Sequence, residues 1–290
     1  MFVVTGATGN VGGELVRVLA ESGERVTAVS RGISGADVPE GVRYRRADLA
    51  DPESLRPAFD GARALFLHDG GAGAHLLSPR DILDVAKGAG VERVVLLSSL
   101  GVVTRPDSAS HGGTGRAIEE AVRQSGLDWT ILRPGGFHSN AFAWAESVRT
   151  RRIVAAPFGD VGLPTVDPAD IAAVAAVALR EDGHGGAVHE LTGPAPTTPR
   201  ERAEAIGAAL GEPVRFVEQS RDEARAQLLA FMPEPVVETT LGILGDPTPA
   251  ELRVSPDVRR ILGRAPLDFT DWARRHVAVF RGEAEVVGQR

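Results

Sequence analysis

Three glycines near the start of the chain have the spacing of a phosphate-binding turn. Gly6, Gly9 and Gly12 form a G-x-x-G-x-x-G motif between the apolar run 2–5 and a segment with helical apolar spacing. In such a turn the first glycine permits a tight bend, the second lets the backbone approach a pyrophosphate, and the third lets helix pack on strand. The helix N-terminus then offers free N–H groups and a positive dipole end. We predict a dinucleotide site, rather than a glycine turn without a ligand, held by Gly6, Thr8, Gly9, Asn10, Val11 and Gly12.

The end of the second predicted strand bears on the choice of dinucleotide. Folds of this kind that prefer NAD place an acidic residue there, on the ribose 2′-hydroxyl. Here the strand ends in Ser30 and Arg31, and a guanidinium can pair bidentately with a 2′-phosphate. We expect NADP(H) to be preferred, with Ser30 as a further hydroxyl donor, although Arg31 alone does not exclude NAD(H). The alternative is a solvated surface arginine.

These motifs need a scaffold, and the alternation of apolar patterns predicts one. Strand-like runs alternate with helix-patterned segments over the first two thirds of the chain, which favours an α/β fold with a doubly wound parallel sheet. The predicted strands are 2–5, 25–30, 42–47, 64–68, 93–98 and 129–133, and the predicted helices are 10–22, 79–89 and 115–125.

The pattern changes after Pro134 and becomes mostly helical from Pro194. Helices are predicted at 137–149, 167–179, 199–210, 221–231 and 235–244, strands at 188–192 and 214–218, and a loop at 157–168. We therefore predict one dinucleotide-binding domain over 1–290. Within it, 137–165 and 194–290 form a smaller, mostly helical substrate lobe over the carboxyl ends of the strands, where ligands bind.

Composition argues against several kinds of site. The chain has 290 residues, 43% of them hydrophobic, and a net charge of −7, which does not suit a nucleic-acid surface. It has no cysteine, which excludes disulfides, thiolate metal sites and a cysteine nucleophile. The histidines lack metal-ligand spacing, so we expect no metal. No run approaches the length of a membrane span and no leader precedes the first strand, so we expect a soluble, cytoplasmic protein without a membrane segment.

Several blocks of sequence together resemble one family. TGATGNVG at 5–12, SSLGV at 98–102, SGLDWTILRPGGFHSN at 125–140, VDPADIAAVAAVAL at 166–179 and LGRAPLDFTDWARRH at 262–276 resemble the NmrA-like atypical short-chain dehydrogenase/reductases. The resemblance covers nearly the whole chain. It implies a Rossmann domain, a nicotinamide cofactor and a C-terminal substrate lobe. Family members include quinone reductases, reductases of polycyclic aromatic metabolites, and redox-sensing regulators that bind the cofactor without turning it over.

The resemblance implies further cofactor contacts. Short-chain reductases hold the adenine amino group after the third strand, which points to Asp48, beside Leu49, ahead of Asp51, which can instead cap a helix. Leu67 and His68 end the fourth strand, within reach of the adenine ribose and the pyrophosphate. The glycine-rich loop that follows either covers the cofactor or forms an exposed connector.

The usual acid of short-chain reductases is missing. Those enzymes use a Tyr-x-x-x-Lys pair whose tyrosine protonates the carbonyl oxygen, but the one tyrosine here, Tyr44, lies in the third strand and the one lysine, Lys87, on an earlier helix. A quinone acceptor would need a strong proton donor less, because its reduction yields a stabilised phenolate. Otherwise His111 supplies the proton, or Ser98 or Ser99 donates to the substrate oxygen, Ser98 also contacting the cofactor. The alternatives are a histidine without a role and serines that only end a strand.

The segment after the sixth strand predicts an aromatic substrate pocket, with core packing as the alternative for its rings. Arg133, just before it, is expected to pair with a carboxylate rather than to act in catalysis. We predict substrate contacts from Ser99, His111, Phe137, His138, Asn140, Trp144 and Phe231.

Two classes of function follow. We predict an NAD(P)H-dependent oxidoreductase, of the atypical type without the Tyr-x-x-x-Lys pair, that reduces a quinone or polycyclic aromatic compound. The resemblance suggests a tailoring step in aromatic polyketide (antibiotic) biosynthesis, alone or with an oxygenase partner. The alternative is a non-catalytic NAD(P)-binding redox sensor. The apolar faces of the late helices fit either a homodimer or packing within the lobe.

Overall fold

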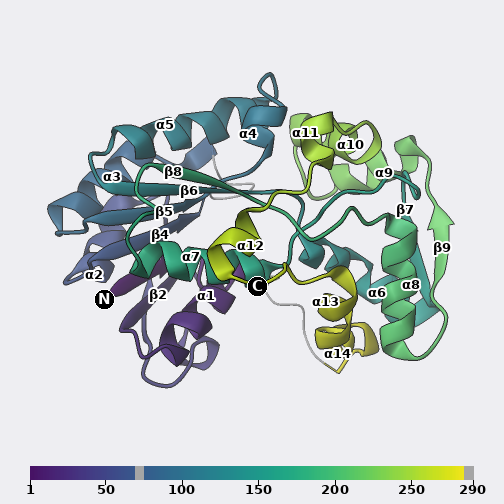
Figure 1. Ribbon diagram of the computed structural model, residues 1–290, viewed down its shortest axis with the longest axis horizontal. Helices are drawn as coiled ribbons and strands as arrows, with labels where there is room; N and C mark the ends of the chain where they lie inside the picture. The colour runs from purple at the N-terminus through teal and green to yellow at the C-terminus, as the bar shows by residue number, and fades with distance from the viewer. Residues whose placement is uncertain (69–74, 284–290) are drawn as a thin grey trace.

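All the predicted strands except 214–218 form one parallel sheet in a computed structural model that describes residues 1–68 and 75–283. The strand order is β3-β2-β1-β4-β5-β6-β8, so the direction of winding reverses between β1 and β4 (Figure 1). Val3 of β1 lies opposite Thr27 of β2 and Leu65 of β4. The strands are β1 (Phe2–Thr5), β2 (Val26–Ser30), β3 (Arg43–Arg46), β4 (Ala64–His68), β5 (Arg93–Leu97), β6 (Asp128–Pro134) and β8 (Ala187–Leu191). The predicted doubly wound α/β fold is confirmed.

Helices cover both faces of this sheet, and the strand residues alternate between them. Val4 and Phe66 point into the core beneath α1 and α7, while Val3 and Leu65 point into the core beneath α2, α3 and α5. Strands buried on both faces read as continuous apolar runs, which is why their sequences do not alternate. The helices of this part are α1 (Asn10–Glu21), α2 (Arg56–Phe59), α3 (Pro79–Gly88), α4 (Gly101–Thr104), α5 (Arg116–Gln124) and α7 (Pro168–Arg180), with 3₁₀ turns η1 (Gly35–Asp37) and η2 (Pro52–Leu55).

A second group of elements lies beyond the carboxyl ends of the strands, to the right in Figure 1. Its core is aromatic, with Trp272 fully buried among Phe142, Phe269 and Phe280. The elements around this core are the 3₁₀ helix η5 (His138–Trp144), α6 (Ala145–Arg151), β7 (Ile153–Ala156), α8 (Pro199–Leu210), β9 (Arg215–Glu218), α13 (Phe269–Arg275) and α14 (Val277–Arg281). β7 and β9 pair in parallel as a two-stranded sheet, and β7 is a strand that the sequence analysis did not predict.

A helical hairpin connects this group with the sheet. It consists of α9 (Arg221–Leu229), α10 (Glu234–Gly245) and α11 (Pro249–Leu252), and it packs around Phe158, Val237 and Leu241. α10 also contacts a short π-helix, η4 (Ala109–Gly115), which follows α4. Arg105 fixes this contact, because its guanidinium donates to Glu251 Oε1 at 2.8 Å and to the backbone oxygen of Asp246 at 2.8 Å.

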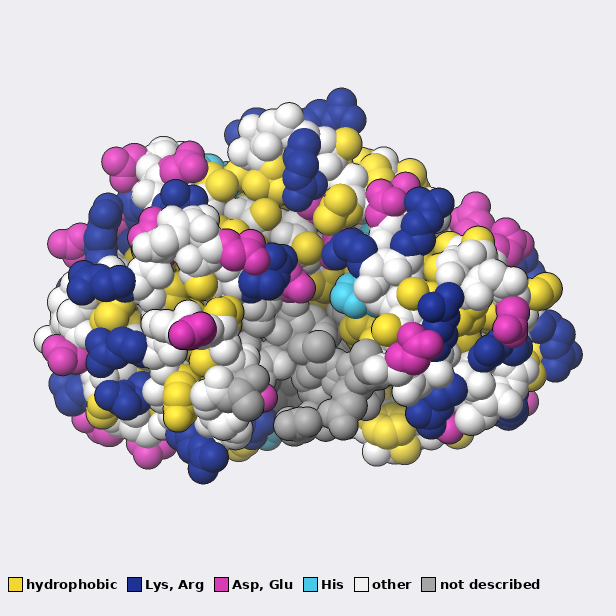
Figure 2. Space-filling view, turned by 90° about the horizontal axis from the view of Figure 1, so that it is seen from below, with side chains coloured by type: hydrophobic (Ala, Val, Ile, Leu, Met, Phe, Trp, Pro, Cys, Tyr) yellow, Lys and Arg dark blue, Asp and Glu magenta, His cyan; other side chains and the backbone are white. Residues whose placement is uncertain are grey.

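On the face shown in Figure 2, the basic and acidic side chains of the described residues are interspersed rather than gathered by sign. This face therefore lacks the broad basic stripe typical of nucleic-acid binding. Among the described helices, none has the length and apolar character needed to cross a membrane.

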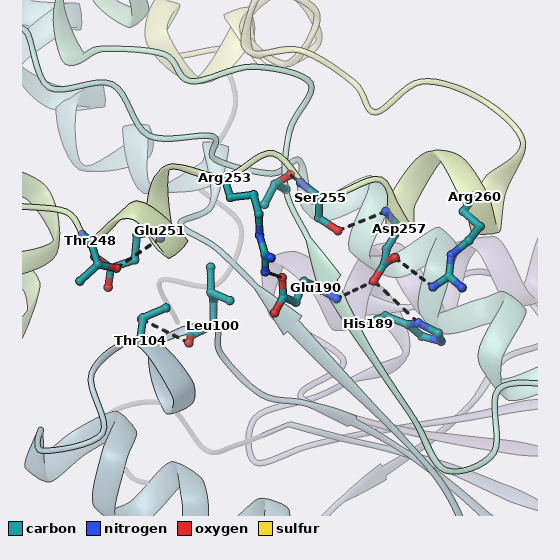
Figure 3. Close-up of polar contacts among 11 residues, drawn as sticks. Leu100, Thr104, His189, Glu190, Thr248, Glu251, Arg253, Ser255, Asp257 and Arg260 are labelled. Atoms are coloured by element: carbon teal, nitrogen blue, oxygen red, sulfur yellow. Dashed lines mark hydrogen bonds and ion pairs between the residues drawn. The ribbon is translucent and has the colours of Figure 1, made fainter.

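The chain then returns to the sheet and protects its edge. After α11, Ser255 N–H donates to Thr192 Oγ1 and Glu190 N–H of edge strand β8 donates to Asp257 Oδ2, both at 2.9 Å (Figure 3). An unpaired edge N–H is thereby satisfied. The helix that follows, α12 (Asp257–Leu262), packs on α7 and β8. The predicted lobe segment 194–290 thus includes a helix that belongs to the layer covering the sheet.

Candidate active site

A large cleft lies over the carboxyl ends of the strands. Its volume is about 1510 Å³, and it spans the reversal point between β1 and β4, where parallel α/β sheets bind ligands. The predicted residues that line it are Gly6, Thr8, Gly9, Asn10, Val11, Gly12, Ser30, Arg31, Asp48, Leu49, His68, Ser98, Ser99, His111 and Phe137. Of the glycine-rich loop after β4, residues 69–74 lie outside the described residues, and His75 lines the cleft.

The glycine turn has the geometry of a phosphate cradle. Gly6 has a left-handed φ of +64°, and a Cβ there would lie 2.7 Å from Cδ2 of His68. A Cβ on Gly12 would lie 2.2 Å from the carbonyl oxygen of Gly6, so turn and helix approach more closely than any side chain allows. Gly9 caps α1 without a side-chain hydrogen bond, and the first turn of α1 holds no acidic residue. This helix end therefore suits the pyrophosphate of a dinucleotide.

The end of the cleft near β2 and β3 carries two guanidinium groups. Arg31 and Arg46 both line it, and Arg46 Nε donates to the carbonyl oxygen of Ile33 at 3.2 Å. The hydroxyls of Thr8 and Ser30 lie 2.9 Å apart and share a hydrogen bond. Arg46 was not predicted from the sequence, where its place at the end of the third strand was the available signal.

One carboxylate oxygen of Asp48 forms a local hydrogen bond, because its Oδ1 accepts the N–H of Ala50 at 3.0 Å. Asp48 lines the cleft and follows β3, the strand that pairs with β2, after which Arg31 lies. The structure thus brings the residue implied for adenine to the predicted end of the site, and its contact with adenine stays a prediction.

At the opposite end, the hydroxyl of Ser98 is engaged by a buried carboxylate. Ser98 Oγ donates to Oε1 of Glu119 at 2.7 Å, and Arg133 Nε donates to the same oxygen at 2.9 Å. The pairing of Arg133 with a carboxylate is confirmed. In this structure the single proton of the Ser98 hydroxyl lies in the bond to Glu119, which argues against the prediction that Ser98 donates to a substrate. Glu119 was missed from sequence.

His111 reaches the cleft from the π-helix η4. Ser108 begins this helix, and its hydroxyl oxygen accepts the N–H groups of His111 and Gly112 at 3.1 and 3.0 Å. The imidazole lies against Gly101 of α4, where an added Cβ would be 2.6 Å from its Cδ2. π-Helical turns are frequent at functional sites. Ser99, beside it, accepts the N–H of Gly101 at 3.1 Å.

Five predicted site residues lie outside the lining of the cleft. Leu67 is 1% exposed within the sheet core, Asn140 is on the surface, Trp144 packs against the lobe core, and Phe231 is 76% exposed at the corner between α9 and α10. The fifth, His138, is 2% exposed. An aromatic wall built from 137–144 is therefore reduced to Phe137.

His138 is part of the lobe core. Its Nδ1 shares a hydrogen bond with Thr165 Oγ1 at 2.9 Å, and its ring meets Phe269 edge-on with centroids 5.3 Å apart. Burial lowers the pKa of His138 from 6.5 to about 4, with a smaller contribution from Arg202. The imidazole is thus neutral at pH 7 and has no access to a substrate in the cleft.

Comparison with known proteins gives the family. Residues 6–182 match the model of a family described as NAD(P)H-binding. The chain belongs to this NAD(P)H-binding family. The match contains the glycine cradle and every strand of the large sheet except the first, β1, and the last, β8. NAD(P)H is therefore the cofactor class, as the resemblance implied, and the features of the cradle fit it. The likeness to NmrA-like reductases is confirmed at the level of the fold.

This NAD(P)H-binding protein has relatives along nearly its full length. It is 37% identical over 296 residues to the (4-alkanoyl-5-oxo-2,5-dihydrofuran-3-yl)methyl phosphate reductase of Streptomyces griseus, which covers 98% of this chain and 100% of that protein. It is 30% identical to an NAD(P)H azoreductase of Xenophilus azovorans, covering 97% and 99% of the two chains. The NADPH-dependent quinone oxidoreductase of Escherichia coli, solved with NADPH, shares the fold with a TM-score of 0.76 at 24% identity, covering 95% and 99%.

Proposed function

We propose that this protein is an NAD(P)H-dependent reductase of small, conjugated, electron-poor acceptors such as quinones or polycyclic aromatic compounds. One observation carries the proposal: a cleft suited to NAD(P)H lacks the acid of ordinary short-chain reductases. Tyr44 is 43% exposed on β3, and Lys87 on α3 donates to the carbonyl oxygen of Ser125 at 3.0 Å. Neither residue lines the cleft.

The nature of the acceptor follows from this missing acid. Reduction of a simple ketone builds a localised alkoxide that needs a positioned proton donor, whereas a conjugated acceptor spreads the charge over its own π-system. The relatives support this argument, because their names describe an oxo-dihydrofuran that carries an alkanoyl group, an azo compound and a quinone. All three kinds of molecule hold a double bond in conjugation.

Different residues along the cleft bind the cofactor and act on the acceptor. Bound NAD(P)H would supply a hydride from its reduced nicotinamide ring. The glycine turn and the start of α1 bind the pyrophosphate, and Arg31, with Arg46 beside it, favours the 2′-phosphate of NADP(H). At the other end His111 donates the proton that follows reduction, since an imidazole titrates near neutral pH. Phe137 offers a flat wall for an aromatic acceptor.

Within this proposal, the natural acceptor is an aromatic polyketide intermediate and an oxygenase acts in the next step. A homodimer formed by the late helices is a further proposal. Purified protein tests both, by sedimentation for the dimer and by coupled turnover with a candidate oxygenase.

The proposal is tested by cofactor oxidation with a panel of acceptors. We expect NADPH to be oxidised by naphthoquinones, an azo dye or an acyl-dihydrofuranone, with NADH less effective. His111→Ala should lower kcat with little change in KM for NADPH, because His111 acts on the acceptor. Saturable cofactor binding without turnover across the panel would instead support a redox sensor and overturn the reductase.

A further inference from the structure

Glu119 is a buried carboxylate directly behind the cleft, on the helix that carries the Tyr-x-x-x-Lys pair in ordinary short-chain reductases. It lies on α5 and is 3% exposed. Four donor groups converge on its two oxygens: Ser98 Oγ at 2.7 Å, Arg133 Nε at 2.9 Å and Nη2 at 2.5 Å, and Arg123 Nη2 at 3.4 Å. The carboxylate therefore ties the ends of β5 and β6 to α5.

These contacts keep Glu119 ionised. Burial raises the pKa of this carboxyl, but hydrogen bonds from Arg133 and Ser98, together with the charge of Arg133, outweigh burial and hold the pKa below its ordinary value. An ionised carboxylate only accepts hydrogen bonds. The single proton of the Ser98 hydroxyl must consequently point toward Glu119, and only the lone pairs of Ser98 Oγ are left for other partners.

The ion pair does not need the serine. Two arginines already balance the charge of Glu119, and the end of β5 is held independently by the bond from Ser98 N–H to the carbonyl oxygen of Leu132 at 2.8 Å. Ser98 nonetheless lines the cleft, as do His111 and Phe137. It follows β5, which the strand order places three strands away from β2, the strand that Arg31 follows. A hydroxyl that donates to a carboxylate is also a stronger acceptor, because consecutive hydrogen bonds polarise one another.

We propose that Glu119 is a positioning residue that makes Ser98 a hydrogen-bond acceptor for the carboxamide N–H of the cofactor's nicotinamide. A dinucleotide whose 2′-phosphate meets Arg31 and whose pyrophosphate meets the glycine turn would place its nicotinamide half at the end where Ser98 lies. The inference rests on the proposed NAD(P)H-dependent function for its ligand, and not on the identity of the acceptor. It reverses the role first predicted for Ser98, from proton donor to acceptor.

Binding measurements with three ligands test this assignment without any turnover. They are NADP⁺, its nicotinic acid analogue, in which a carboxylate replaces the carboxamide, and adenosine 2′,5′-bisphosphate, which lacks the nicotinamide half. An acceptor at Ser98 disfavours the carboxylate, which brings lone pairs in place of an N–H. The wild-type protein should therefore bind NADP⁺ about tenfold or more tightly than the acid analogue, and the bisphosphate serves as a measure of the adenosine end.

Ser98→Ala should weaken the binding of NADP⁺ by about threefold to tenfold, which corresponds to the loss of one hydrogen bond. The affinity for the bisphosphate should not change. The preference of this variant for NADP⁺ over the nicotinic acid analogue should largely disappear. Ser98→Thr, which keeps the hydroxyl, should retain that preference. Ser125→Ala is the matched control, because Ser125 also bonds to α5, through the carbonyl oxygen of Val122 at 2.7 Å, but lies outside the cleft lining.

Glu119→Gln tests the positioning role itself. A glutamine amide no longer fixes the direction of the Ser98 proton, so the discrimination between amide and acid should fall even where the protein is folded, as checked by circular dichroism. Wild-type protein that binds the acid analogue as tightly as NADP⁺ would overturn the proposal. Equal losses for both dinucleotides in Ser98→Ala would place the contact on a ribose hydroxyl and overturn the carboxamide assignment. Absence of turnover with this discrimination intact would refute only the reductase.

Discussion

Gly12→Ala offers a sharp test of the phosphate cradle, because Gly13 beside it provides a matched control. The Cβ of an alanine at 12 would lie 2.2 Å from the carbonyl oxygen and 2.7 Å from the carbonyl carbon of Gly6. These are backbone atoms, which cannot rotate away, and the overlap exceeds 1 Å against a normal separation of about 3.5 Å. At Gly13 the nearest atom, the oxygen of Ala7, would be 3.4 Å away, which is ordinary contact.

The two substitutions share the same helix and the same propensity gain, which is up to about 1 kcal/mol for glycine to alanine in α1. Only Gly12→Ala adds overpacking, which costs about 1–3 kcal/mol, and relief of the clash must move the turn from the helix. We expect the free energy of unfolding of Gly12→Ala, measured by urea unfolding, to be about 2 kcal/mol lower than that of Gly13→Ala. We also expect Gly12→Ala to bind NADPH at least about tenfold more weakly than Gly13→Ala. Equal stability and equal affinity of the two variants would refute the cradle geometry.

Three further predictions address the cofactor end, the lobe core and the hairpin. Arg31→Ala should weaken NADPH binding by about tenfold through loss of a charge-assisted contact while NADH changes little; equal losses for both would contradict the 2′-phosphate role. The pKa of His138 is about 4 when folded and 6.5 ordinarily, so the unfolded state binds more protons in that window. Stability should therefore fall by up to about 3 kcal/mol as pH drops from 6.5 to 4, a slope that urea unfolding should find reduced in His138→Asn. Arg105→Met leaves Glu251, 6% exposed, without its ion-pair partner and should destabilise the protein by about 3 kcal/mol, whereas unchanged unfolding would show that α10 docks without it.

The dinucleotide-binding half could be predicted from sequence because its signals are local. Short, largely apolar runs mark β1, β4 and β5, and Gly6, Gly9 and Gly12 encode a turn whose atoms lie within a few residues of one another. The sequence also predicted that Arg133 pairs with a carboxylate, because a cation at the end of a buried strand needs an anion. The structure shows this partner to be Glu119. Its identity required the fold.

The lobe and the nicotinamide end depended on distant segments. β7 has four residues and pairs with β9 about sixty positions later in the chain. Its short length and the distance of its partner meant that the local sequence did not indicate a strand. His138 turns into the lobe because Phe269 and Trp272, from the far end of the chain, surround it. The direction of the Ser98 hydroxyl is set by Glu119 on α5, and the sequence shows that helix but not which of its side chains points inward.

The most direct test of the central claim compares a quinone with a simple ketone of similar size as acceptors for NADPH, in wild-type protein and in His111→Ala. We expect measurable oxidation of NADPH by the quinone, at most background oxidation by the ketone, and a lower rate with the quinone in the variant. Reduction of the ketone as fast as the quinone would show that this cleft contains a strong acid that the structure does not reveal. Tight NADPH binding with no oxidation by either acceptor would contradict the claim that the protein is a reductase.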